Sequence, residues 1–70
     1  MKQIIIKYPN GKIENKYYKN HLNQYNGLYI SYWNNGNIWY KRNFFNDKRF
    51  GIANYYYYNN NKPTIITYYL

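Results

Sequence analysis

The chain has 70 residues, with ten Lys and Arg, two acidic residues and no cysteine. A chain of this length forms one small domain and buries only about 60% of the surface that its unfolded form exposes. Without cysteine it has no disulfides, and a structural zinc site would lack its usual ligands. The longest aliphatic run, residues 4–6, is too short for a signal peptide or a membrane span. We therefore expect a soluble cytoplasmic protein for which membrane binding is a remote alternative.

The charge is more informative than the residue bias. Asn, Tyr, Ile and Lys make up 44 of the 70 residues, and all four have A/T-rich codons. The excess of Tyr and Asn is therefore explained equally well by genome composition and by function. Glu and Asp also have A/T-rich codons, yet only Glu14 and Asp47 occur. The net charge of +8 predicts a positive potential that attracts nucleic acid, anionic lipid or an acidic protein face.

Alternating residues and turn signals divide the chain into six expected strands. No long segment has the 3.6-residue apolar period of an amphipathic helix, and the 14 Asn residues disfavour helix. The sequence predicts an all-β fold, a single antiparallel six-stranded meander of three hairpin repeats in one domain, residues 1–70. The expected strands are residues 3–8, 12–19, 28–33, 38–45, 50–58 and 64–69, and the expected turns are residues 9–11, 20–27, 34–37, 46–49 and 59–63.

Two Asn-Gly dipeptides, Asn10-Gly11 and Asn35-Gly36, lie 25 residues apart, and a third turn follows at residues 59–61. Asn-Gly readily takes the positive φ angles of a two-residue type I′ turn, which fixes the register of the hairpin. The expected pairs are Tyr8 with Ile13, Lys7 with Glu14 and Ile5 with Lys16 in the first hairpin, and Trp33 with Ile38, Tyr32 with Trp39, Ile30 with Lys41 and Tyr29 with Arg42 in the second.

This register makes both faces of the sheet aromatic. One face would carry Tyr29, Trp33, Ile38 and Tyr40, and the other Leu28, Ile30, Tyr32 and Trp39. Tyrosine covers apolar area while its hydroxyl group stays hydrated, so the pattern is typical of a thin sheet with two partly solvated faces.

The repeat resembles the MORN type (membrane occupation and recognition nexus), and more closely the bacterial and viral MORN-like arrays labelled as antitoxin components. Asn61 departs from the pattern, because the family has Gly there. The resemblance implies a binding scaffold of stacked hairpins without catalytic chemistry. It is carried by Tyr8, Asn10-Gly11 and Ile13, by Gly27, Tyr32, Trp33, Asn35-Gly36 and Ile38, and by Gly51, Tyr56, Tyr58 and Asn60-Asn61.

The residues offer no catalytic constellation and no cofactor site. His21 is the single histidine and lies in an expected loop, and Ser31 is the single serine, without a Gly-x-Ser-x-Gly context. Glu14 and Asp47 lie on different hairpins, which disfavours a carboxylate pair for acid–base catalysis. No Gly-rich phosphate loop precedes a helix. We therefore interpret the protein as non-enzymatic.

The expected contact surface combines aromatic and basic residues on the fourth strand and the turn after it. Such interleaving is typical of single-stranded nucleic-acid binding, in which bases stack on rings and phosphates contact Lys and Arg. The simpler alternative is that the aromatics form the core of the sheet and the charges its solvated rim. The candidate partner-binding residues are Tyr29, Trp39, Lys41, Arg42, Lys48 and Arg49.

Three functions remain open at this point. The first is a small basic inhibitor, such as an antitoxin or an anti-CRISPR, that binds an acidic or nucleic-acid-handling protein. The second is direct binding of RNA or single-stranded DNA, and the third is binding to anionic lipid, for which no amphipathic element is evident. The β-prone edge segments, residues 3–7 and 64–70, also predict a homodimer, unless a monomer curls its sheet to cover them.

Overall fold

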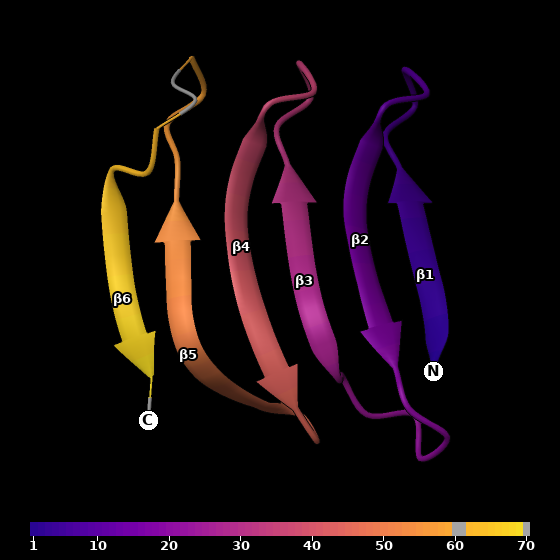
Figure 1. Ribbon diagram of the computed structural model, residues 1–70. Coiled ribbons are helices and arrows are strands. Elements are labelled where there is room, and N and C mark those ends of the chain that lie inside the picture. The colour runs from indigo at the N-terminus through magenta and orange to yellow at the C-terminus, as the bar shows by residue number, and fades with distance from the viewer. Residues whose placement is uncertain (60–61, 70) are drawn as a thin grey trace.

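Six antiparallel strands form one sheet in the order in which they occur in the chain (Figure 1). The computed structural model describes residues 1–59 and 62–69, and none of these residues is helical. The predicted all-β class and the six-stranded antiparallel meander are confirmed. The strands are β1 (Lys2–Lys7), β2 (Ile13–Lys19), β3 (Gly27–Tyr32), β4 (Ile38–Phe45), β5 (Lys48–Tyr55) and β6 (Ile65–Tyr69).

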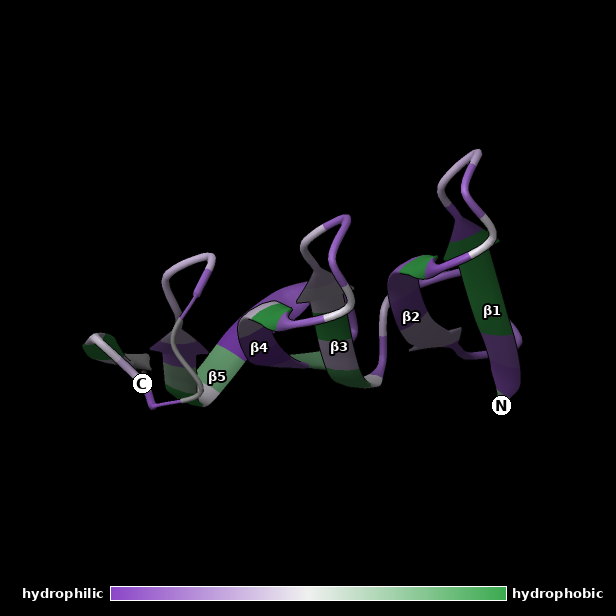
Figure 2. Cartoon of the chain, turned by 90° about the horizontal axis from the view of Figure 1, so that it is seen from above, coloured by the Kyte–Doolittle hydropathy of each residue, from purple (hydrophilic) through white to green (hydrophobic). Residues whose placement is uncertain are grey.

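The described residues form a single layer, with Cα extents of 35 × 29 × 11 Å (Figure 2). Their buried side chains are few: Ile30 and Ala53 among the hydrophobic residues and Ser31 among the polar ones. Most side chains on both faces are therefore partly solvated, as the sequence predicts. Stability must come largely from cross-strand pairs and from contacts between neighbouring side chains on one face.

The predicted type I′ turn at Asn10-Gly11 is wrong. Gly11 N donates to Tyr8 O at 2.9 Å and Tyr8 N donates to Lys12 O at 2.8 Å, so the hairpin loop has three residues. Gly11 has a φ of +87°, whereas Asn10 is not among the residues with positive φ. The side chain of Asn10 instead accepts a hydrogen bond from Lys12 N at 2.9 Å. A turn ending in one left-handed residue is the usual three-residue hairpin loop, and Gly suits that position.

The loop 25 residues later has the same construction. Trp33 N donates to Asn37 O at 2.7 Å and Gly36 N donates to Trp33 O at 2.9 Å. Gly36 has a φ of +93°, and Asn35 Oδ1 accepts a hydrogen bond from Asn37 N at 2.9 Å. The two Asn-Gly units are therefore structural repeats, although their turn type differs from the predicted one.

The longer loop shifts the register beside it by one residue. Ile5 lies opposite Lys16 as predicted, but Lys7 lies opposite Ile13, so the predicted pairs Lys7–Glu14 and Tyr8–Ile13 are wrong. In the second hairpin, the predicted pairs Ile30–Lys41 and Tyr29–Arg42 are confirmed. Tyr32 lies opposite Ile38 there, which replaces the predicted pairs Tyr32–Trp39 and Trp33–Ile38.

A type I′ geometry occurs instead at Asn46-Asp47, which have φ values of +50° and +71°. This two-residue loop joins Phe45 to Lys48, so β5 begins before the predicted residue 50. Asp47 also anchors the connection between β2 and β3, because Tyr25 N donates to Asp47 Oδ1 at 2.8 Å and Asp47 N donates to Tyr25 O at 3.0 Å. The β2–β3 and β4–β5 connections at this end of the sheet are therefore hydrogen-bonded to each other.

The loops at the opposite end are linked from one repeat to the next. Asn10 Nδ2 donates to Asn34 O at 3.0 Å, and Asn35 Nδ2, 25 residues later, donates to Tyr58 O at 3.1 Å. Figure 1 shows these loops in a line along one end of the sheet. A short repeat that contacts only its neighbours in this way is typical of solenoid-like arrays.

Candidate binding surfaces

The two faces of the sheet differ in composition, and the strand register defines one row of side chains on each. Because successive residues of a strand point to opposite faces, neighbouring rows lie on opposite sides. We name the faces after their rows. The tyrosine face carries Ile6, Asn15, Ser31, Tyr40, Tyr55 and Ile65, and the lysine face carries Ile5, Lys16, Ile30, Lys41, Asn54 and Ile66, each listed from β1 to β6.

Tyr29 lies at the centre of the tyrosine face. Its ring stacks on Tyr17 at 4.9 Å and on Tyr40 at 6.2 Å, and Tyr25 meets it edge-on at 5.6 Å. Burial and then the neighbouring Tyr40, Tyr25 and Tyr17 raise the pKa of Tyr29 to about 12, against the lowering effect of Arg42. The ring faces that a nucleic-acid base would use are therefore already in contact with other rings.

Arg42 completes this stack. Its guanidinium carbon lies 4.2 Å from the centroid of the Tyr40 ring and 5.4 Å from that of Tyr55. Its Nε also donates to Tyr55 Oη at 3.2 Å. Arg42 is half-buried, so its guanidinium group stabilises the aromatic packing in addition to carrying charge.

Trp39 lies near the loops, against Trp33, with ring centroids 4.4 Å apart and planes 22° apart. It also meets Tyr40 edge-on at 5.4 Å, which places it with the tyrosine face. The prediction that Trp39 and Trp33 lie on different faces of the sheet is wrong, because the register shift beside Ser31 and Tyr32 inserts an extra residue here. The Trp39 side chain is 42% exposed.

Glu14 occupies the position 25 residues before Trp39. Burial, and then the charge of Glu14, raise the pKa of Tyr8, which in turn occupies the position 25 residues before Trp33. The first repeat thus has a carboxylate beside a tyrosine where the second has two stacked indoles. The stacked indoles of Trp33 and Trp39 therefore have no counterpart in the first repeat.

On the lysine face, Lys16 and Lys41 lie on either side of Ile30. Ile30 is only 8% exposed, although the described residues form a single layer. Residues directly opposite on adjacent strands have Cβ atoms about 5 Å apart, so the aliphatic parts of the two lysines cover Ile30 while their ammonium groups reach solvent. The result is a pair of cations in the middle of this face.

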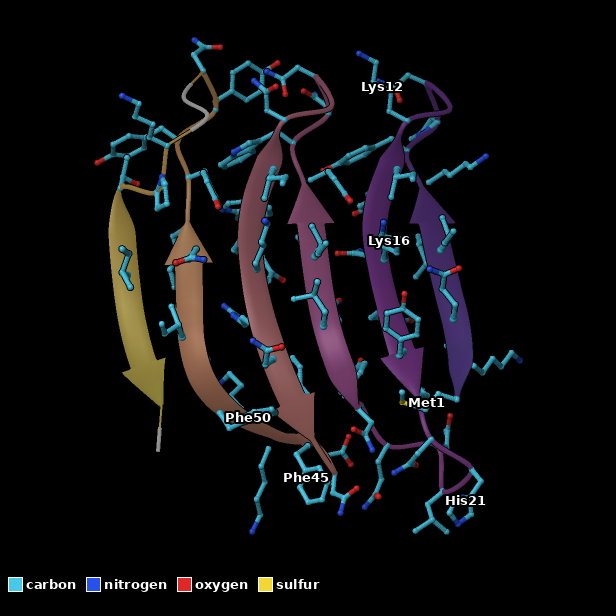
Figure 3. The ribbon with its side chains drawn as sticks, in the orientation of Figure 1. Met1, Lys12, Lys16, His21, Phe45 and Phe50 are labelled. Carbon is cyan, nitrogen blue, oxygen red and sulfur yellow. The ribbon has the colours of Figure 1, made fainter. Side chains whose placement is uncertain are left out.

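Exposed apolar side chains lie elsewhere on the lysine face. Figure 3 labels Lys16 midway along β2 and Phe45 and Phe50 near the β4–β5 turn, at the end away from Lys12. Lys48 pairs with Phe45 and so adds a further cation to this face. Its exposed large apolar side chains are Ile5, Leu28, Phe45, Phe50, Ile52 and Ile66.

The six candidate residues from the sequence therefore do not form one surface. Lys41 and Lys48 lie on the lysine face. Tyr29, Arg42, Trp39 and Arg49 lie on the tyrosine face, since Arg49 pairs with Phe44 and Arg42 with Tyr29. The sequence-based set missed Lys16 and the apolar residues around it. The signal was present in the two correct pairs Ile5–Lys16 and Ile30–Lys41, which the β2–β3 pairing joins into one row.

Within the described ranges, no three His, Asp or Glu side chains lie close enough together to hold a metal ion. The same residues include no helix long and apolar enough to cross a membrane. No protein-family model, curated protein or solved structure matches the chain.

Proposed function

We propose that this protein is a non-enzymatic, MORN-like binding module that acts as a small basic inhibitor of a nucleic-acid-handling protein in the cytoplasm. The observation that carries the proposal is the lysine face, where cations lie among exposed apolar side chains. A protein surface with acidic groups at its centre and apolar groups around them complements this arrangement. Such an inhibitor, of the antitoxin or anti-CRISPR kind, needs no chemistry beyond occupying its partner's surface.

The size of the face suits a protein partner. The sheet measures 35 × 29 Å, which accommodates a standard interface of about 800 Å² per partner. Its exposed side chains include the aliphatic residues Ile5, Leu28, Ile52 and Ile66. Aliphatic groups suit the apolar core of a protein interface, whereas the exposed rings on which bases could stack, Phe45 and Phe50, lie at one end of this face near the β4–β5 turn.

Direct binding of RNA or single-stranded DNA is the second candidate, and the exposed indole of Trp39 favours it. One side of Trp39 contacts Trp33, and its 42% exposure leaves area on which a base could stack. The net charge of +8 would attract the phosphates.

The test compares two charge-matched variants. Lys16→Gln/Lys41→Gln alters the lysine face, whereas Lys2→Gln/Arg49→Gln alters exposed basic residues of the tyrosine face, and each variant removes two positive charges. Each immobilised protein is exposed to nuclease-treated host lysate, and the captured partner is then purified and its affinity measured. We expect at least a tenfold loss of affinity for the lysine-face variant and less than a threefold loss for the control.

Two results would contradict the proposal. If capture by the parent disappears after nuclease treatment, the protein binds nucleic acid, and Trp39→Ala should then abolish the retention of single-stranded oligonucleotides. If both variants bind the purified partner equally, the partner does not contact the lysine face.

A further inference from the structure

The two edge strands of the sheet present matching apolar side chains. β1 pairs only with β2, and β6 pairs only with β5, so each has one side without a neighbouring strand (Figure 1). Ile5 and Ile6 on β1 and Ile65 and Ile66 on β6 are all between 41% and 65% exposed. Long, exposed, β-branched edges are templates for pairing with a further strand.

The rows of the sheet show how these edges fit each other. The row on the tyrosine face begins with Ile6 and ends with Ile65, and the row on the lysine face begins with Ile5 and ends with Ile66. If a second copy continues both rows, Ile65 meets its Ile6 and Ile66 meets its Ile5. Cross-strand contacts between β-branched residues would then form on both faces at once.

We propose that copies of this chain assemble head to tail, with β6 of one copy pairing antiparallel with β1 of the next. β6 runs in the direction of β2 and β4, so β1 of the next copy takes the direction that a seventh strand would have. The three-residue loop at Asn10 of the added copy would then extend the line of loops that already repeats every 25 residues. The sheet and its line of loops thus continue across the junction.

Two-fold pairing fits the same edges less well. A β1–β1 contact that brings residues 4–6 of both copies together places Lys2 of each copy against or beside Lys7 of the other, and like charges at such positions are destabilising. A β6–β6 contact covers Ile65 and Ile66 but leaves Ile5 and Ile6 exposed. The head-to-tail contact covers all four isoleucines without opposing the lysines, and it is open-ended, since the two edges involved differ. It replaces the closed homodimer that the sequence alone predicts.

The test uses one variant for each edge. Ile5→Lys/Ile6→Lys blocks β1, and Ile65→Lys/Ile66→Lys blocks β6, both at exposed positions. By sedimentation velocity at micromolar to millimolar concentrations, the parent should form species larger than a dimer, and each variant alone should remain a monomer. An equimolar mixture should give the mass of a dimer, because each variant retains the edge that the other lacks. Dimers of either variant alone, a parent that stays monomeric throughout, or a mixture that stays monomeric would each overturn the proposal.

Cross-linking gives a second readout in case a lysine variant does not fold. The chain has no cysteine, so Ile5→Cys and Ile66→Cys each introduce a single thiol. Oxidation of an equimolar mixture should give mainly the mixed covalent dimer, since opposite positions on paired strands can meet disulfide geometry. Homodimers of the Ile5→Cys protein in excess of the mixed product would indicate two-fold β1 pairing and contradict the head-to-tail assembly.

Discussion

Tyr29 stacks on Tyr17 across the β2–β3 junction, with ring centroids 4.9 Å apart and ring planes only 9° apart. These strands share only two paired positions, at Asn15–Ser31 and Lys16–Ile30. Beyond those positions, Tyr25 packs between the two strands and contacts both rings, at 5.4 Å from Tyr17 and 5.6 Å from Tyr29. Tyrosine rings therefore supplement the backbone pairing and the loop hydrogen bonds that join the first and second hairpins.

The raised pKa of Tyr29 predicts a loss of stability at alkaline pH. In the folded chain this pKa is about 12, above the ordinary tyrosine value of about 10. The stabilising effect of the neutral phenol is therefore complete below pH 10 and is lost as the pH rises toward 12. The melting temperature should fall across this interval, and Tyr29→Phe should reduce the fall. Tyr57→Phe, which changes an exposed tyrosine, is the control; equal pH profiles for all three proteins would contradict the prediction.

Gly36→Val should destabilise the second hairpin. Gly36 has a φ of +93°, and a residue with a Cβ in the left-handed region costs about 1–2 kcal/mol, more when it is β-branched. Space is not the difficulty, because the nearest atoms to a Cβ at this position, those of Lys12, are 3.8 Å away or more. Gly36→Asn is the matched control, since Asn tolerates this conformation better than Val. Urea unfolding should rank the parent above Gly36→Asn and Gly36→Asn above Gly36→Val; a Val variant as stable as the Asn variant would argue against the backbone cause.

Asn35 makes one hydrogen bond to the next loop and one within its own loop, and two substitutions can separate their contributions to stability. Its Nδ2 donates to Tyr58 O in the next loop, while its Oδ1 accepts from Asn37 N in its own loop. Asn35→Asp keeps an acceptor and loses the donor, whereas Asn35→Ala loses both. Each hydrogen bond contributes about 1 kcal/mol, so we expect Asn35→Asp to lose about that amount in urea unfolding and Asn35→Ala about twice as much. Equal stability of Asn35→Asp and the parent would show that the loops are not coupled through this amide.

Arg42 should affect stability as well as charge. Its guanidinium group lies over Tyr40 and bonds Tyr55, so Arg42→Ala should lower the free energy of unfolding by about 1–2 kcal/mol. Lys48→Ala removes an exposed cation and should change it by less than about 0.5 kcal/mol. If the two variants have the same free energy of unfolding, the guanidinium contacts contribute nothing to stability. A variant that removes Arg42 together with its basic neighbours would therefore not isolate binding from folding.

The strand pattern could be predicted because each hairpin carries its own local signal. Alternation fixed the pairs Ile5–Lys16 and Tyr29–Arg42, which lie away from the loops. The turn type could not be predicted in the same way, because an Asn-Gly pair fits both a two-residue loop and the last two residues of a three-residue loop. The alternatives differ by one residue in register, which changes the face on which Trp39 lies.

The candidate surface was harder to predict than the strands. Lys41 and Arg42 are adjacent in sequence and must point to opposite faces of a strand, so a set containing both could not be one patch. Lys16 joins Lys41 only through the pairing of β2 with β3. The connection before β3 is held by Asp47, 22 residues from Tyr25, so no local sequence signal sets that register.

The single layer also has a consequence for how the molecule can change in length. Each hairpin contacts only its sequence neighbours, and the few buried residues belong to no common centre. Duplicating or deleting a 25-residue unit would lengthen or shorten the sheet without rebuilding an interior. The number of hairpins can therefore change in whole units, and the length of both faces changes in proportion.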